Sequence, residues 1–150
     1  INDYLHFFLL DSLIQFNELK KQNPHLKTLI GIGGFRATSR AFSKIADDRK
    51  KRINFATSLL KFMQDYKFDG VDIDWLYPTI RRGFVKLVKE CRYVFDDNKL
   101  GKYYLITIAV SGRSNVIQAA YNARELNRFD FHIIINSKYI YNIPYTSTNS

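Results

Sequence analysis

Four short apolar runs, separated by longer stretches with helical periodicity, are the feature that most restricts how this chain can fold. The first run, LKTLIGIGG (26–34), is rich in β-branched residues and ends in glycines, as a buried parallel strand does at its carboxyl-terminal turn. The other runs lie within residues 69–78, 103–110 and 131–136. Strands that alternate with amphipathic helices predict an α/β protein with a parallel sheet.

Two of the intervening stretches have the spacing of amphipathic helices. Residues 47–66 start with two aspartates, which suit the positive end of a helix, and apolar residues recur there every three or four positions. A second stripe follows Pro78 and consists of Phe84, Leu87, Val88, Cys91, Val94 and Phe95. The expected order is a helix, then strand and helix three times, then a strand, which gives four parallel strands with right-handed crossovers.

The composition fits one packed domain over residues 1–150. Hydrophobic residues make up 46% of the chain and aromatic residues 15%, which argues against disorder. Cys91 is the one cysteine, so the chain has no intrachain disulfide and no thiolate metal cluster, and its apolar surroundings predict an inert buried thiol. The apolar runs are too short to span a bilayer, and no signal segment is recognised at the N-terminus.

The charge is strongly positive, with 23 Lys and Arg against 14 Asp and Glu and a net charge of +9. Such a field attracts polyanions, so binding to nucleic acid or to heparin-like polymers stays open. The basic run Arg49–Arg52 is expected to be the solvated start of a helix, with a polyanion patch as the alternative. His6, His25 and His132 share no ligand spacing, and the glycines of 27–34 lack a phosphate-loop pattern, so neither a metal nor a cofactor is expected.

The segment DGVDIDWLYP (69–78) carries carboxylates on a run that otherwise reads as a buried strand. Carboxylates two residues apart on one face of a strand are about 7 Å from each other, and each must be hydrated or hydrogen-bonded. Two interpretations are open: satisfied core aspartates that follow an Asp69-Gly70 turn, or a functional pair. Because side chains alternate between the faces of a strand, the residues divide into Asp72, Asp74 and Leu76 on one face and Val71, Ile73 and Trp75 on the other.

The stretch FDGVDIDWLYP resembles the FDGxDxDWEYP signature of family 18 glycoside hydrolases, the chitinases and chitinase-like lectins. LKTLIGIGGF is similar to the LKTLLSIGGW strand of that family, and YLITIAVSG is similar to the strand that follows the acidic one. The resemblance covers about residues 12–136 and leaves 137–150 as an irregular tail. It implies a partial (β/α)8 barrel, about strands three to six with their helices, whose functional side chains sit at the carboxyl ends of the strands.

Such a partial barrel has consequences for its partners. An open four-stranded parallel sheet leaves two exposed edges, so the remaining half of the barrel is expected in a longer chain or in an assembly. The resemblance also implies an extracellular protein.

The resemblance implies a specific chemistry at the acidic strand. Active members use substrate-assisted hydrolysis, in which the N-acetyl oxygen of the substrate attacks the anomeric carbon and the glutamate of DxxDxDxE protonates the leaving oxygen. Asp69, Asp72 and Asp74 match the three aspartates of that motif, and Leu76 falls at the acid position. Loss of a general acid commonly costs around 10² to 10⁴ in rate. No glutamate of this chain is expected to replace the missing acid, because all three are expected in helical or turn segments away from the strand ends: Glu18, Glu90 and Glu125.

A second part of the family pattern also departs from the active form. The strand that ends in MxYD aligns its methionine with Ile135, its tyrosine with Ser137 and its aspartate with Lys138. A lysine opposes the positive charge that develops on the oxazolinium. Phe35 stands where the family has a subsite tryptophan, so the candidate sugar-binding residues are Phe35, Asp74 and Ile135.

The resulting functional prediction is a catalytically inactive chitinase-like protein that can bind chitin or N-acetylglucosamine oligosaccharides. One alternative is a residual hydrolase that works through Asp74 or a residue outside this segment. The other is a scaffold without a carbohydrate role, whose positive surface meets a polyanion or a protein.

Overall fold

Four parallel strands lie side by side in the order in which they occur in the chain, β1-β2-β3-β4. The computed structural model describes residues 3–34, 39–75, 81–111, 121, 123–126 and 132–136. The α/β class and the four parallel strands are therefore confirmed. The elements are α1 (Asp3–Gln22), β1 (Leu29–Gly33), α2 (Ser39–Ala46), α3 (Arg49–Asp65), β2 (Gly70–Asp74), α4 (Arg81–Asp96), β3 (Leu105–Ser111), α6 (Ala123–Leu126) and β4 (His132–Asn136).

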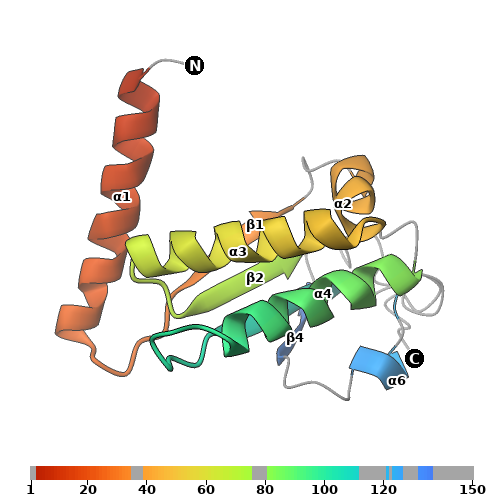
Figure 1. Ribbon diagram of the computed structural model, residues 1–150. Helices are drawn as coiled ribbons and strands as arrows, with labels where there is room; N and C mark the ends of the chain where they lie inside the picture. Colours follow the sequence, from red (N-terminus) through yellow and green to blue (C-terminus); the bar gives the residue numbers. More distant parts are fainter. Residues whose placement is uncertain are drawn as a thin grey trace, which may run out of the picture.

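Helices α3 and α4 cover one and the same face of the sheet (Figure 1). In a doubly wound sheet the helices divide between the two faces, whereas in a (β/α)8 barrel all of them lie outside. The one-sided cover is therefore the arrangement of a barrel segment, and the uncovered face corresponds to the inside of the barrel. The helix predicted over 47–66 begins after Asp48, whose side chain accepts a hydrogen bond from the Lys51 backbone N–H (3.0 Å).

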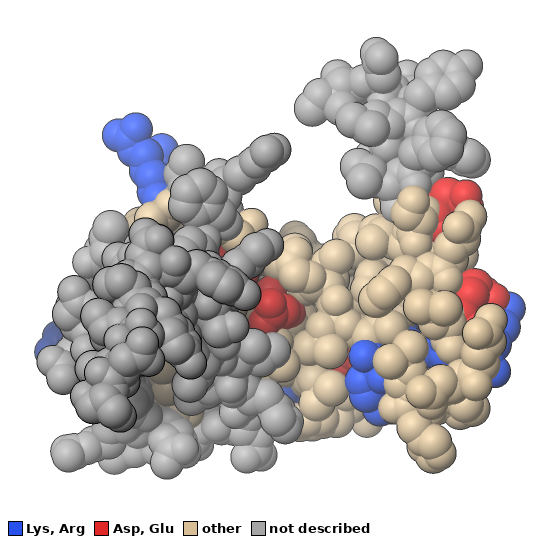
Figure 2. Space-filling view, turned by 180° about the vertical axis from the view of Figure 1, so that it is seen from behind, with Lys and Arg blue, Asp and Glu red and all other residues tan. Residues whose placement is uncertain are grey.

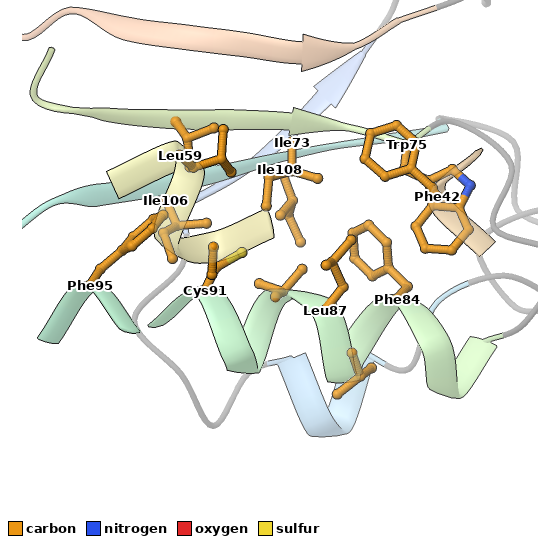
Figure 3. Close-up of a cluster of buried hydrophobic side chains, with 14 of the residues drawn as sticks. Phe42, Leu59, Ile73, Trp75, Phe84, Leu87, Cys91, Phe95, Ile106 and Ile108 are labelled. Atoms are coloured by element: carbon orange, nitrogen blue, oxygen red, sulfur yellow. The ribbon is translucent and has the colours of Figure 1, made fainter. Parts of the chain in front are cut away.

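The hydrophobic core lies between the covered face of the sheet and these helices (Figure 3). Ile73, Ile106 and Ile108 point from β2 and β3 toward Leu87 and Cys91 of α4, and all five are fully buried. Burial raises the pKa of the Cys91 thiol to about 12, so this thiol stays protonated at neutral pH. The prediction of an inert buried cysteine is confirmed.

The basic run Arg49–Arg52 is only partly solvated, so the expectation for it was wrong in one position. The Arg52 side chain is buried, with the residue 8% exposed, and its Nη1 donates a hydrogen bond to the Ala46 carbonyl (2.6 Å). Its Nε lies 3.5 Å from the Glu90 carboxylate of α4. Charge alone predicted exposure, but an arginine that reaches a carbonyl and a distant carboxylate can be buried.

Asp69 joins the amino ends of three strands to α1. Its Oδ2 accepts a hydrogen bond from the Thr28 N–H (3.0 Å) and lies 2.6 Å from Lys20 Nζ, while Lys102 Nζ lies 3.2 Å from Oδ1. Partial burial would raise the pKa of this carboxyl, but the hydrogen bonds from Lys20, Thr28 and Lys102 outweigh it and lower the pKa to about 2. Asp69 is therefore a structural aspartate in this fold.

The carboxyl ends of β1 and β2 approach each other more closely than a side chain would allow. Gly33 has φ of +120°, and a Cβ there would lie 2.3 Å from the Asp74 carbonyl oxygen. Gly34 then donates its N–H to the same oxygen (2.9 Å). A glycine at position 33 is thus required both by the backbone conformation and by the neighbouring strand.

Gly33→Ala is expected to lower the free energy of unfolding by about 1–3 kcal/mol, since the new Cβ is strained at this φ and meets the Asp74 carbonyl. Gly31→Ala is the matched control on the same strand, because a Cβ at Gly31 would find no atom within 4 Å. Urea unfolding followed by the fluorescence of Trp75 measures both variants. Equal effects of the two substitutions would contradict the close approach of the strand ends.

Asp69→Asn is expected to destabilise the chain by about 2 kcal/mol at pH 7. The pKa of Asp69 in the folded chain, about 2, lies below its ordinary value, so its contribution is complete above about pH 4 and disappears as the pH falls through 2. The difference between wild type and variant should therefore shrink over that range in urea unfolding. Asp65→Asn is the control, because this half-exposed carboxylate pairs with Lys61 along α3 and has no other ion-pair partner among the described residues. A difference that does not change with pH would show that the charge of Asp69 is not the cause.

Candidate functional site at the carboxyl ends of the strands

Strand β2 has two different faces, as the alternation of its residues predicts. Val71 and Ile73 are fully buried against the helices, and Trp75 directly after the strand is buried as well. Asp72 and Asp74 are half-buried and belong to the opposite face. The strand therefore turns its carboxylates toward the side of the sheet that no described helix covers.

Trp75 fixes the carboxyl end of β2 (Figure 3). Its ring stacks on Phe42 of α2, with centroids 5.2 Å apart, and lies 5.9 Å from the ring of Phe84 of α4. The indole N–H donates to Ser39 Oγ (2.8 Å), and the Tyr121 hydroxyl donates to the Trp75 carbonyl (3.3 Å). Contacts from α2, α4 and Tyr121 thus hold the backbone at the point where the chain enters the segment after Trp75.

Asp72 has a hydroxyl partner on the neighbouring strand. Thr107, which is directly opposite Asp72 in the β2–β3 register, donates its hydroxyl to Asp72 Oδ1 (2.5 Å). Thr107 is 7% exposed, and its position on β3 was not singled out from the sequence. The available signal was the single hydroxyl side chain among the apolar residues of 105–110, which indicates a partner on the same face of the sheet.

Asp74 lacks such a partner within the described part of the chain. Its Oδ1 is buried and accepts no hydrogen bond there. Burial raises the pKa of this carboxyl, and the negative charge of Asp72 raises it further. A Cβ on Gly34 would lie 3.7 Å from Asp74 Oδ2, so the glycine leaves the space beside the carboxyl free of a side chain. This carboxyl can accept a hydrogen bond from a ligand N–H when ionised, or donate one when protonated.

Figure 2 shows the uncovered face of the sheet, with acidic side chains in its central hollow. The half-buried carboxylates of this face are those of Asp72 and Asp74. Gly31 lies opposite Asp72 on β1 and is exposed, which widens the hollow next to the carboxylates. A hollow at the carboxyl ends of parallel strands is where barrels of this class place their ligands.

The structure separates the three aspartates of the motif. Asp69 lies at the amino end of β2, roughly 16 Å along the strand from Asp74 at about 3.3 Å per residue. Ile135 lies in β4 opposite Val110, and its side chain is outside the described part. The remaining candidates lie outside the described residues altogether: Phe35, Leu76, Ser137 and Lys138.

The three glutamates of the chain lie in helices, as expected. Glu18 is in α1, Glu90 is in α4 and Glu125 is in α6. Among the described residues, no three His, Cys, Asp or Glu side chains come together in a way that could hold a metal ion. No helix in the described ranges is both long and apolar enough to cross a bilayer.

Comparison with known proteins agrees with this geometry. The sequence pattern of Glycosyl hydrolases family 18 matches residues 2–142, a wider range than the motifs alone indicate. Probable chitinase 2 of Drosophila melanogaster is 34% identical over 145 residues, which cover 86% of this chain and 29% of that protein. The chain therefore spans about a third of the length of this curated relative.

Solved structures of family 18 proteins have a fold similar to that of this chain. YKL-39, solved in the presence of chitooligosaccharides, has a TM-score of 0.78 at 30% identity over 91% of this chain and 38% of its own. A glutamate-to-leucine mutant of catalytic domain 2 of the Ostrinia furnacalis Group II chitinase, in complex with penta-N-acetylchitooctaose, has a TM-score of 0.67 at 32% identity over 77% of this chain and 32% of its own. The chain thus belongs to family 18 of the glycosyl hydrolases, and its sheet and helices form part of a (β/α)8 barrel.

Proposed function

We propose that this chain is a chitinase-like protein that binds N-acetylglucosamine oligosaccharides and does not hydrolyse them. The observation that carries the proposal is Leu76, which follows two residues after Asp74 at the position of the acid in the family motif. The site then keeps a carboxyl for binding and lacks the group that would complete the reaction.

The chemical argument concerns the proton of the leaving group. In substrate-assisted hydrolysis the glycosidic oxygen must take up a proton as the anomeric bond breaks. The alkyl side chain of Leu76 has no proton to give. Lys138, at the position of the aspartate of MxYD, substitutes a positive for a negative charge, which disfavours the positive oxazolinium. The two substitutions are independent and oppose the same reaction.

Binding depends on groups that this chain retains. Asp74 offers a carboxyl without a hydrogen-bond partner in the described part of the chain, and an N-acetyl N–H is a suitable donor to it. Gly34 leaves the adjoining space open, and the next residue, Phe35, supplies an aromatic ring on which the apolar face of a sugar can pack. We assign substrate contacts to Phe35, Asp74 and Ile135 on this basis.

Two relatives support binding without cleavage. YKL-39 was solved with chitooligosaccharides, and a chitinase domain in which a glutamate is replaced by leucine was solved with a chitin oligosaccharide. A leucine in place of a glutamate is therefore compatible with sugar binding on this fold. By the same family resemblance, the location that we propose is extracellular.

Residual hydrolysis through Asp74 is the second candidate. The observation in its favour is that burial and the charge of Asp72 raise the pKa of Asp74, which increases the fraction of the carboxyl that carries a proton. Against it, the side chain of Asp74 is one methylene group shorter than that of a glutamate, and Asp74 lies two residues earlier, one pleat deeper on the strand.

Titration calorimetry with chitotetraose, with product analysis on the same samples, tests the proposal. The wild type is expected to bind without forming product, and Asp74→Ala is expected to bind about tenfold more weakly, as for loss of one hydrogen bond to a carboxyl. Leu76→Glu should bind and release product slowly, because Ser137 and Lys138 remain. Product from the wild type, or binding that Asp74→Ala leaves unchanged, would contradict the proposal. Absence of all binding would move the search to protein and polyanion partners.

Release of a fluorophore from a chitobioside separates the second candidate from the first. The wild type is expected to give no more than background release. Release that falls as the pH rises through the raised pKa of Asp74, and that Asp74→Asn abolishes, would instead establish Asp74 as the acid. Asp65→Asn is the control, because this carboxylate pairs with Lys61 on α3 and is not among the groups that raise the pKa of Asp74.

A further inference from the structure

Tyr103 presents an aromatic ring on the surface near the amino end of β3. The residue is 54% exposed, and the Arg92 guanidinium lies 4.5 Å from the centroid of its ring. Because the cation occupies one face of the ring, solvent has access through the other. Tyr103 belongs to the connection between α4 and β3, at the end of the molecule away from α2 (Figure 1).

Arg92 is held in place by its own partners. It is buried, its Nε donates to Asp96 Oδ1 (2.9 Å) and its Nη1 donates to the Tyr104 carbonyl (2.7 Å). Its Nη2 lies 2.6 Å from the same Asp96 oxygen as an ion-pair contact, without hydrogen-bond geometry. The guanidinium is thus a fixed support, and its attraction to the ring restricts the motion of Tyr103.

A fixed ring is a better binding surface than a mobile one. Single exposed aromatic residues are ordinary, and most of them lose side-chain freedom when they bind a ligand. Tyr103 has already lost part of that freedom in the free protein. The Asp96 carboxylate, which is 54% exposed, contacts the same Arg92 guanidinium, and both contacts use Oδ1. An aromatic face next to an exposed carboxylate oxygen matches a sugar ring, which has apolar C–H faces and hydroxyls at its edge.

We propose that Tyr103, supported by Arg92 and together with the Asp96 carboxylate that Arg92 holds, is a second binding platform for one ring of an N-acetylglucosamine polymer. The choice of ligand rests on the proposed function, whereas the platform rests on the contacts of Tyr103 and Arg92. The platform lies near the amino ends of the strands, and the site at Asp74 lies at their carboxyl ends. A short oligosaccharide in the hollow therefore does not reach it, but a polymer surface with many chain ends and faces can occupy both sites.

A polymer that binds at two sites of one protein is retained more strongly than a polymer that binds at one site. Binding at one site raises the effective concentration of polymer at the other, so the retention on an insoluble polymer exceeds what either site gives alone. Loss of the platform should consequently weaken retention on the polymer and leave the affinity for a short oligosaccharide unchanged.

Sedimentation with colloidal chitin, paired with calorimetry on soluble chitotetraose, tests the platform. Tyr103→Ala should weaken retention on chitin roughly threefold to tenfold, the scale of one lost aromatic contact, with no change for chitotetraose. Tyr103→Phe should retain chitin like the wild type, because the ring remains. Tyr93→Ala is the matched control, since Tyr93 is 64% exposed on α4 and the described residues place no cation over its ring. Far-ultraviolet circular dichroism checks that each variant is folded.

The outcomes for the platform and for the site at Asp74 can be told apart. Retention of Tyr103→Ala like that of the wild type, equal losses in Tyr103→Ala and Tyr93→Ala, or a loss in Tyr103→Phe would each overturn the platform. The platform is also overturned if the wild type is not retained on chitin at all. If chitotetraose does not bind while Tyr103→Ala still lowers retention, the proposed site at Asp74 fails and the platform stands.

Discussion

The alternation of side chains along β2 is the constraint on which the rest of the structure depends. One face of the strand is apolar and closes the core against α3 and α4, so the other face must carry the carboxylates. A shift of one residue in register would bury Asp72 and Asp74 under the helices and expose Ile73, at a cost of several kcal/mol. The position of the candidate site thus follows from the packing of the core on its far side.

The two ends of β2 place aspartates in opposite electrostatic surroundings. At the amino end, two lysines and a backbone N–H surround Asp69 and lower its pKa, so this carboxylate stabilises the fold. At the carboxyl end, burial raises the pKa of Asp74 and the charge of Asp72 raises it further, and Oδ1 of Asp74 accepts no hydrogen bond from the described residues. A carboxyl oxygen that accepts no hydrogen bond from the described residues is the one available to a ligand.

The features that shape the site and the features that would drive hydrolysis are separate sets of residues. Gly33, Gly34 and the contacts of Trp75 determine where the strand ends lie, and these contacts make no use of a general acid. Under the proposed function, the changes at Leu76 and Lys138 therefore remove a chemical step and leave the hollow at the strand ends in place. This separation is the physical basis on which a family 18 barrel can bind a sugar that it does not cleave.

The sequence by itself determined the four strands, the helices α3 and α4 and the orientation of Asp72 and Asp74, because each follows from periodicity within a single segment, and the alternation of these segments gave the parallel order. The separate helix α2 between β1 and α3 was not predicted. The sequence also supplied the family motif, and with it the proposal that Leu76 stands at the position of the acid. Only the tertiary structure decided that Thr107 satisfies Asp72, that Asp69 is bound by Lys20 and Lys102, and that Arg52 is buried. These outcomes join residues from different elements, and whether a polar side chain finds its partner depends on how distant segments pack and not on the neighbours of that side chain in the chain.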